Sequence, residues 1–356
     1  EMKCVLVSVI SAQTLPNFLL IKELRGRYSE MIFITTREME GNGDENKSRS
    51  RWLERAAGIE IGSTRRIVVK EDSWADIEDK LKQISSESST NYIVNLTGGT
   101  KVMTLALFRY FAQSGNRIFY VPFPKNEYCE LYPNLHAQPA IITFRCTLSQ
   151  YLATHGLYYT CNNVFVKEQE STFNLFLKAK NADFRLHEIE EIKYAHQSEC
   201  PEDKCYYSGG WFEEYMYHLI KKYFKLSQSR IALNVNLYRN PDDVESDNEY
   251  DLMFVHENAL FVVECKTSLG KSLENARKNI DRYLYKLGAI TRDFGLKVNS
   301  YIVTLTQLRN TENKLSEKLE KRQKILGVKA IFDQSSFYHL PEMIHQLKPK
   351  LSDLFE

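Results

Sequence analysis

The segment from Asn248 to Lys266 constrains the fold of this chain more than any other. It holds two short runs rich in Leu, Val and Phe, Asp251–Val255 and Ala259–Cys265, which are typical of β-strands. Between them His256-Glu257-Asn258 is polar and turn-like, so the two runs predict a β-hairpin. A turn between Glu257 and Asn258 pairs residues whose numbers sum to 515.

This register places Asp251 opposite Glu264, with β-carbons about 5 Å apart. Lys266 lies two residues beyond Glu264 and therefore on the same face. Two carboxylates about 4 Å apart repel each other by roughly 4 kcal/mol at an effective dielectric of 20. A fold tolerates this if one carboxyl is protonated, if both are well solvated, or if a cation lies between them. Mg²⁺ or Mn²⁺ suits such hard oxygen ligands, so the hairpin predicts a metal-dependent nuclease site. The alternative is an ordinary solvated amphipathic strand pair.

A helix is predicted upstream of the hairpin, opening at Gly209–Tyr215. Its apolar residues follow the i, i+3, i+4 spacing of one buried face: Phe212, Met216, Leu219, Ile220 and Tyr223. Glu213 and Glu214 in the first turn suit the helix dipole without any further role. The functional interpretation makes one of them a third carboxylate of the metal site, Glu213 ahead of Glu214.

The first 143 residues alternate strand and helix patterns, which predicts a doubly wound α/β domain with a parallel sheet. In such sheets ligands bind beyond the carboxyl ends of the strands. The predicted strands are Lys3–Ile10, Met31–Thr35, Arg66–Val69, Tyr92–Leu96 and Arg117–Pro122, and the predicted helices are Phe18–Arg25, Trp74–Ile84 and Val102–Gln113.

Polar loops follow three of these strands. Thr97–Lys101 leads from the fourth strand into a helix, and its glycines let the backbone approach an anion. Ser11–Asn17 follows the first strand, and Thr35 and Thr36 end the second. Three polar loops at one sheet edge predict a nucleotide pocket. The alternative for Thr97–Lys101 is a tight turn with Thr100 as helix N-cap.

The segments GGWFEEY, NEYDL and VVECKT resemble the PD-(D/E)xK nuclease superfamily, whose core is a mixed sheet flanked by helices. The Pro-Asp doublet is absent, since Tyr250 precedes Asp251. The resemblance implies that Asp251 and Glu264 are metal ligands, that Lys266 is the catalytic lysine and that Glu213 is the supporting carboxylate of the same site. It also implies that Lys286, on a helix predicted over Leu273–Leu287, faces the substrate.

SAQTLPN and NLTGGTKVM resemble a CRISPR-associated Rossmann-fold (CARF) sensor domain. Joined to the nuclease motifs, they resemble the ancillary effector nucleases of type III CRISPR systems. This implies a homodimer that binds a cyclic oligoadenylate, above all the tetra-adenylate, at its two-fold axis. The implied lining residues are Ser11, Gln13, Thr14, Asn17, Thr97, Gly98, Gly99, Thr100 and Lys101.

The predicted boundaries are 1–143 for the sensor, 144–207 for a connector and 208–356 for the nuclease. Thr147–Gly156 reads as a short helix of a small helical or winged-helix-like module. Seven cysteines without framework spacing predict reduced thiols in a cytoplasmic protein, and no apolar run has the length of a membrane span.

The net charge of +1 excludes a globally basic nucleic-acid binder. Residues 271–350 nevertheless hold 16 Lys or Arg against 8 Asp or Glu, a local surplus that suits a phosphate backbone. The expected function is an Mn²⁺- or Mg²⁺-dependent endonuclease that cleaves single-stranded RNA, DNA or both after a nucleotide binds. Two rivals are a nucleotide-independent restriction- or repair-type DNA endonuclease and a non-catalytic DNA-binding regulator.

Overall fold

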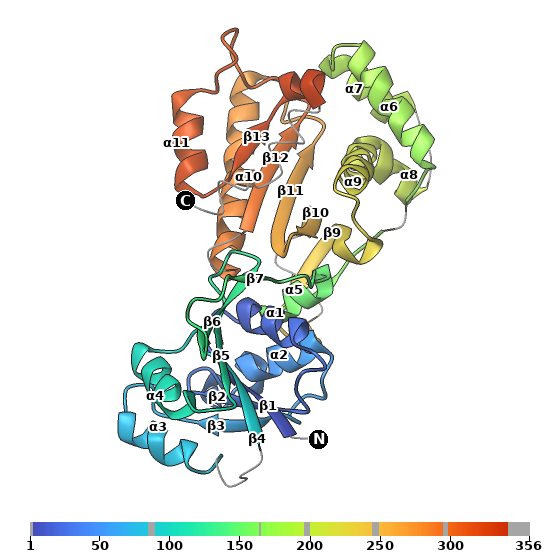
Figure 1. Cartoon of the computed structure of the whole chain (residues 1–356). Coiled ribbons are helices and arrows are strands. Elements are labelled where there is room, and N and C mark those ends of the chain that lie inside the picture. Colours follow the sequence, from blue (N-terminus) through green and yellow to red (C-terminus); the bar gives the residue numbers. More distant parts are fainter. Residues whose placement is uncertain are drawn as a thin grey trace. The chain divides into compact units, whose positions relative to one another are not determined.

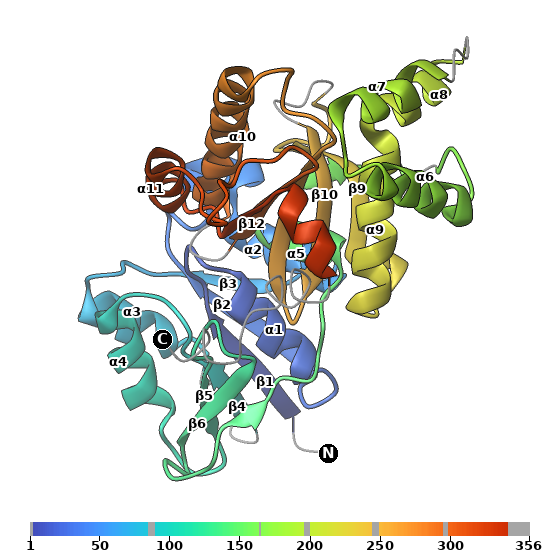
Figure 2. The ribbon, with the colours of Figure 1, turned by 90° about the horizontal axis from the view of Figure 1, so that it is seen from above.

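The computed structural model describes residues 3–84, 90–163, 165–195, 200–243, 249–294 and 298–340 (Figures 1 and 2). Contacts divide the chain into two units. The first comprises Glu1–Tyr158 with Tyr238–Val244, and the second comprises Tyr159–Leu237 with Glu245–Glu356. In these described ranges no helix has both the length and the apolar character that crossing a membrane requires.

The first unit is built on a seven-stranded sheet of order β3-β2-β1-β4-β5-β6-β7. The five strands from β3 to β5 are parallel, which confirms the predicted doubly wound sheet. The antiparallel edge formed by β6 and β7 was not predicted. The strands are β1 (Lys3–Val9), β2 (Glu30–Thr35), β3 (Arg65–Val68), β4 (Thr90–Asn95), β5 (Arg117–Tyr120), β6 (Glu127–Tyr132) and β7 (Ala140–Ile141).

Helices cover both faces of this sheet, as a parallel sheet requires. In Figure 1, α1 and α2 lie on one face, and α3 and α4 lie on the other. Five consecutive residues of β1, from Val5 to Val9, are therefore buried, and this explains its continuous apolar run. The helices are α1 (Leu15–Glu23), α2 (Arg49–Ala57), α3 (Trp74–Leu81), α4 (Lys101–Phe111) and α5 (Leu148–Thr154).

Residues 144–207 divide between the two units. The predicted short helix is α5, which begins with a capping box at Thr147 and Gln150 and packs on α2 in the first unit. The helices that follow, α6 (Gln169–Asn181), α7 (Leu186–Ala195) and α8 (Pro201–Cys205), belong to the second unit. The domain boundaries at 143 and 207 stay predictions.

The second unit is built on a six-stranded sheet of order β13-β12-β11-β10-β9-β8, with β8 spanning Tyr158–Thr160. Strands β9 (Ile231–Tyr238), β10 (Glu249–His256) and β11 (Ala259–Lys266) are antiparallel neighbours. Strands β12 (Val298–Thr304) and β13 (Ala330–Phe332) continue the sheet parallel to β11. The mixed sheet confirms the fold class predicted for the nuclease part.

Helix α9 (Trp211–Tyr223) packs on β10 and β11 and supplies Phe212 and Met216 to the core. Helices α10 (Leu273–Asp293) and α11 (Glu317–Ile325) lie on the opposite face in Figure 1. A row of stacked aromatic rings crosses four strands of the sheet, each centroid 4.6–6.3 Å from the next: Phe254, Phe261, Tyr301 and Phe332. Such cross-strand pairs fix the register of the hairpin.

Candidate active site and candidate nucleotide site

The hairpin pairs as the sequence predicts. Leu252 lies opposite Val263, and the ladder runs to His256 opposite Ala259, so each pair sums to 515. Glu257 and Asn258 have φ of 49° and 61°, which is the two-residue turn in which both central residues are left-handed. Asp251 and Glu264 stand one position beyond the last of these pairs.

Lys266 joins the two carboxylates. Its Nζ lies 2.5 Å from Oδ2 of Asp251 and 3.0 Å from Oε1 of Glu264. The Cys265 backbone N–H donates a further hydrogen bond of 2.8 Å to Oδ2 of Asp251. Both carboxylates are buried, Asp251 to 6% exposure and Glu264 to 1%. The structure therefore brings together three of the four predicted catalytic side chains.

A second ammonium group reaches the same site from α10. Lys286 Nζ lies 2.8 Å from Oε2 of Glu264, so each oxygen of that carboxylate holds one lysine. Two tyrosine rings flank the ammonium groups. The ring centroid of Tyr283 lies 5.0 Å from Lys266 Nζ, and that of Tyr250 lies 5.1 Å from Lys286 Nζ. Sequence analysis placed neither ring beside the predicted catalytic residues, although the i, i+3 spacing of Tyr283 and Lys286 puts these two on one helix face.

Glu213 lies in the first turn of α9, within electrostatic reach of the hairpin. Burial and the neighbouring charge of Asp251 raise the pKa of Glu213 from 4.5 to about 8. Lys266 opposes this shift, and Glu264 adds to it. The pKa of a carboxyl group responds to charges only at short range, so Glu213 shares the electrostatic environment of the site.

Glu214 points elsewhere. Its Oε1 accepts a hydrogen bond of 3.1 Å from the Val166 backbone N–H, and its Oε2 accepts one of 3.3 Å from the Thr172 hydroxyl. Burial raises the pKa of Glu214, and these two hydrogen bonds lower it again in part. Of the two adjacent carboxyls, Glu214 thus ties α9 to α6 and the segment before it, while Glu213 is turned to the hairpin.

The electrostatics of the pair Glu264 and Lys266 are dominated by burial and mutual attraction. Burial and the charge of Asp251 raise the pKa of Glu264. For Lys266, burial alone lowers the pKa, but Asp251 and Glu264 outweigh it, and the net pKa lies above the usual value. Lys266 is therefore a firmly protonated ammonium in this state and not a general base.

The donor atoms of the site suit a hard divalent cation, since Asp251, Glu264 and Glu213 offer only carboxylate oxygens. Their mutual repulsion, which is visible in the raised pKa of Glu213, is the feature a cation relieves. Within the part of the chain that the structure describes, no three His, Cys, Asp or Glu side chains stand close enough to hold a metal ion. The arrangement fits the cation in chemistry, while two lysines now neutralise Glu264.

The predicted nucleotide loops of the first unit lie side by side. Strands β1 and β4 are neighbours, and the strand order changes direction between them, which is where α/β sheets bind ligands. Gly98 has φ of +109°, and a β-carbon there would lie 2.4 Å from Oγ of Ser11. Gly99 has φ of +76°, and a β-carbon there would clash with Val9. The glycines thus let the loop after β4 pack directly on the loop after β1.

Three of the predicted ligand residues are buried and held by protein partners. Thr14 donates to the backbone oxygen of Thr154. Asn17 donates from Nδ2 to Ser8 Oγ at 2.9 Å and to the Val9 oxygen at 2.6 Å. Thr97 Oγ1 accepts from the Val121 N–H at 2.7 Å. These side chains hold the loops in place, so the prediction that they line the ligand surface finds no support in their orientation.

The remaining predicted residues lie at the surface. Gln13, Gly99, Thr100 and Lys101 are exposed, and Ser11 and Gly98 are half-buried. Thr100 is the N-cap of α4, since its Oγ1 accepts from the Met103 N–H at 3.2 Å. The cap alternative is therefore correct for Thr100. Lys101 is the exposed first residue of α4, at a helix end that suits an anion.

Sequence analysis missed a buried polar group beneath these loops. Asn95 Nδ2 donates to Ser8 Oγ at 3.2 Å, and Asn95 Oδ1 accepts from the Thr97 N–H at 3.0 Å. Ser8, Asn17 and Asn95 are all fully buried. Polar residues inside two otherwise apolar strands were the available signal for this network.

Comparison with known proteins gives two family matches. The Card1 CARF domain matches residues 5–151, and the Card1-like endonuclease domain matches residues 200–334. Together they span more than three quarters of the chain. A curated protein, FAM81B of Bos taurus, is 26% identical over 157 residues, and the chain spans only 36% of its length.

Three solved structures share the fold. Can2 from Sulfobacillus thermosulfidooxidans, in complex with cyclic tetra-adenylate, has a TM-score of 0.70 and 21% identity over 97% of this chain and 100% of its own. Protein VC1899 from Vibrio cholerae has a TM-score of 0.73 and 17% identity over 98% and 99%. A type III CRISPR defence DNA nuclease activated by cyclic oligoadenylate has a TM-score of 0.60 and 18% identity over 91% of this chain, which spans about half of that nuclease (52%).

These matches agree with a fold of two α/β units, each built on its own sheet. The chain therefore belongs to the proteins that join a Card1 CARF domain to a Card1-like endonuclease domain.

Proposed function

We propose that this protein is a divalent-metal-dependent endonuclease that cleaves single-stranded RNA, DNA or both with little sequence specificity after a cyclic oligoadenylate binds. The observation that carries the proposal is the convergence of Asp251, Glu264 and Lys266 on one buried spot. It occurs in a domain that matches a family of endonucleases. Two buried carboxylates and an ammonium group are the side chains that metal-assisted phosphodiester hydrolysis uses.

Asp251, Glu264 and Glu213 would hold Mg²⁺ or Mn²⁺. When bound, the ion would supply Lewis-acid activation of the phosphate and of an attacking water. The Lys266 ammonium would offset the negative charge that develops on the phosphate. Lys286, held on the other oxygen of Glu264, would keep that carboxylate oriented.

The sensor part would bind cyclic tetra-adenylate at the edge formed by the loops after β1 and β4. Gln13, Gly99, Thr100 and Lys101 are the exposed residues there, and the start of α4 offers free N–H groups to a phosphate. A solved relative of the same fold, Can2, was captured with cyclic tetra-adenylate. The two-fold symmetry of that ring suits a homodimer with one half-site on each protomer.

A cytoplasmic location belongs to the same proposal. None of the seven cysteines, all of which lie in the described ranges, forms a disulfide, and Cys161, Cys200 and Cys205 are exposed, which suits a reducing compartment.

The test is a cleavage assay on the full chain. Single- and double-stranded RNA and DNA are incubated with Mn²⁺ or Mg²⁺, with and without each cyclic oligoadenylate, and the products are separated by electrophoresis. We expect cleavage of single strands only when metal and cyclic tetra-adenylate are both present. Glu264→Gln should remove cleavage and keep nucleotide binding. Cleavage that needs no nucleotide would favour the restriction- or repair-type alternative, and intact cleavage by Glu264→Gln would refute the site.

A further inference from the structure

The carboxyl ends of three parallel strands meet at one edge of the nuclease sheet. Lys266 pairs with Thr304, and Val303 pairs with Phe332, so the segments after β11, β12 and β13 leave the sheet side by side. The Leu305 N–H also donates to the Lys266 backbone oxygen at 3.1 Å. The proposed catalytic lysine therefore stands at the beginning of this edge.

Two cavities follow the same edge. The smaller, of about 260 Å³, is lined by Thr267 and Ser268 directly after Lys266, and also by Thr306 and Gln307. The larger, of about 630 Å³, begins at Gln307 and ends at His339. Gln307 lines both cavities, and we call the two together the edge groove. Its smaller cavity is lined by the two residues that directly follow Lys266, and its larger cavity is in the range of small-molecule sites, roughly 300–1,000 Å³.

The floor of the edge groove is fixed by a buried aspartate. Asp333 is fully buried and accepts hydrogen bonds of 2.9 and 2.8 Å from the backbone N–H groups of Leu308 and Arg309. It also holds the Arg309 guanidinium at 2.8 Å, and that group donates to the Ile331 oxygen as well. Arg309 is thus a structural group, and the loop has its shape before any ligand arrives, which lowers the entropic cost of binding.

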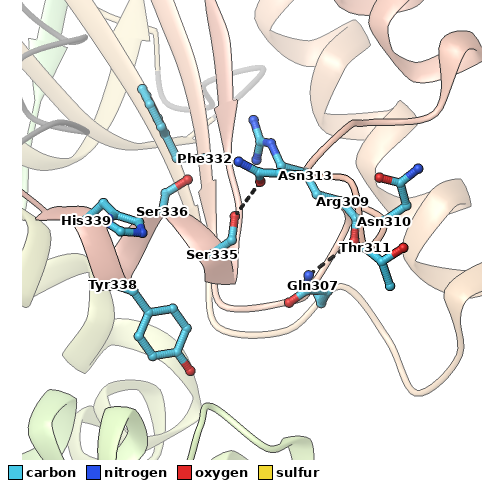
Figure 3. Close-up of a pocket in the computed structure, with 10 residues that line it drawn as sticks. All are labelled: Gln307, Arg309, Asn310, Thr311, Asn313, Phe332, Ser335, Ser336, Tyr338 and His339. Carbon is cyan, nitrogen blue, oxygen red and sulfur yellow. Dashed lines mark hydrogen bonds between the residues drawn. The ribbon is translucent and has the colours of Figure 1, made fainter.

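The lining of the larger cavity is rich in hydrogen-bonding groups. Figure 3 shows the loop residues from Gln307 to Asn313 on one side and the residues from Ser335 to His339 on the other. Ser335 Oγ donates to Asn313 Oδ1 at 3.4 Å, a hydrogen bond that links the two sides (Figure 3). None of the ten residues that line this cavity is acidic. Amide and hydroxyl groups of this kind donate to and accept from the edges of unpaired bases.

An aromatic ring completes the far end. Tyr338 is 45% exposed, and its hydroxyl donates to Oδ1 of Asp183 at 3.2 Å, which fixes the orientation of the ring. A fixed, exposed ring is a stacking platform for a base, and stacking of this kind tolerates every sequence. The bases of a duplex are stacked inside it and do not enter a recess of this shape, whereas the bases of a single strand do.

From these features we propose that the edge groove holds unpaired nucleotides beside the scissile phosphate, with a base stacked on Tyr338. The proposal rests on the endonuclease function proposed above and adds the reason for a preference for single strands. The contacts are made to bases and not to the metal, so they are measurable when no cleavage takes place.

The test is binding of fluorescent oligonucleotides to the full chain in EDTA with cyclic tetra-adenylate, followed by anisotropy. Tyr338→Ala should bind a single strand about five- to hundred-fold more weakly than the parent, the loss expected for one stacked base. Tyr338→Phe should bind like the parent, because it keeps the ring. Tyr194→Ala is the matched control, since Tyr194 is 60% exposed and lines neither cavity.

Two substitutions of opposite charge at Thr311 test the same groove and leave Tyr338 unchanged. Thr311 is exposed at the rim, so Thr311→Lys should strengthen and Thr311→Glu should weaken binding of a single strand, while Ser171→Glu on α6 should do neither. The proposal is overturned if Tyr338→Ala binds within two-fold of Tyr194→Ala, or if both Thr311 variants match the parent. Equal losses on duplex and single strand would overturn it as well. A protein that binds in this manner but never cuts would refute the endonuclease function instead.

Discussion

Two adjacent carboxyls on α9 give the sharpest test of the site. We predict that Glu213→Gln abolishes metal-dependent cleavage, because it removes an oxygen donor that faces Asp251. Glu214→Gln should keep cleavage, because that side chain is turned to Val166 and Thr172. The two substitutions are the same chemical change one residue apart, so each controls for the other.

Removal of the Glu214 carboxyl should lower the stability of the fold, although it should spare cleavage. Glu214→Ala leaves the half-buried Val166 N–H without its acceptor, which costs about 1–3 kcal/mol. For a unit of this size that lowers the melting temperature by about 2–4 °C for each kcal/mol. Cleavage measured well below the melting temperature should survive. Glu214→Gln, a neutral isostere at a site that already disfavours charge, should be close to neutral in stability.

The pH dependence of Glu213 has a definite sign. Its pKa in the metal-free protein, about 8, lies above its ordinary value of 4.5, so between these values the folded state binds more protons than the unfolded state. Stability in EDTA therefore falls as the pH rises from about 4.5 to 8. At about 1.4 kcal/mol for each pKa unit, the shift sets an upper bound of about 5 kcal/mol.

Glu213→Gln should flatten this dependence, and in EDTA at pH 8 it should melt above the parent protein. Thermal melts from pH 5 to 8, with and without Mn²⁺, measure the effect. Mn²⁺ should raise the melting temperature of the parent protein more than that of Glu213→Gln. The reasoning fails if Glu213→Gln cleaves as well as the parent, or if Glu214→Gln is the inactive one of the two.

Three further predictions concern other parts of the chain. Lys286→Ala should destabilise the metal-free protein by a few kcal/mol, because it removes a partner of a buried carboxylate, and Mn²⁺ should restore most of the loss in thermal melts; Lys278→Ala, on the same helix but exposed, should change little. Gly98→Ala should weaken binding of cyclic tetra-adenylate in calorimetry, because its β-carbon would meet Ser11, whereas Gly26→Ala, also at positive φ but in open space, should not. Removal of divalent metal with EDTA should stop cleavage of all substrates, and added Mn²⁺ should restore it; cleavage that persists in EDTA would exclude a metal-dependent reaction.

The hairpin was predictable to the residue because its information is local. A strand period of two and a two-residue turn determine which side chains share a face, and both are written in Asp251–Lys266. The choice between Glu213 and Glu214 could not be predicted in the same way. Neighbouring positions on a helix point about 100° apart, and only the packing of α9 decides which of the two side chains points toward the hairpin. Only its position directly after the apolar Phe212 favoured Glu213.

The burial of polar residues could not be predicted from the sequence, and their role in lining a ligand site stays a prediction. Thr14 and Asn17 were assigned to a ligand surface because polar side chains in a loop are usually exposed. The structure buries both and satisfies their donors with partners that include Thr154, 140 positions away from Thr14. Such long-range hydrogen bonds leave no trace in a single sequence. The same holds for β6 and β7, whose antiparallel edge depends on contacts with β5 rather than on their own pattern.

The two-residue length of the turn at Glu257 and Asn258 affects the geometry of the candidate active site. It lies at the far end of the hairpin from Asp251 and Glu264, yet together with the cross-strand pairs it sets which residues meet there. Adding one residue to it would send the functional side chains of one strand to the opposite face of the sheet, unless a bulge absorbed the extra length. Other surface loops of this fold can therefore change in length more freely than this turn. The turn does not contact the predicted catalytic residues, but its length is constrained because it controls their pairing.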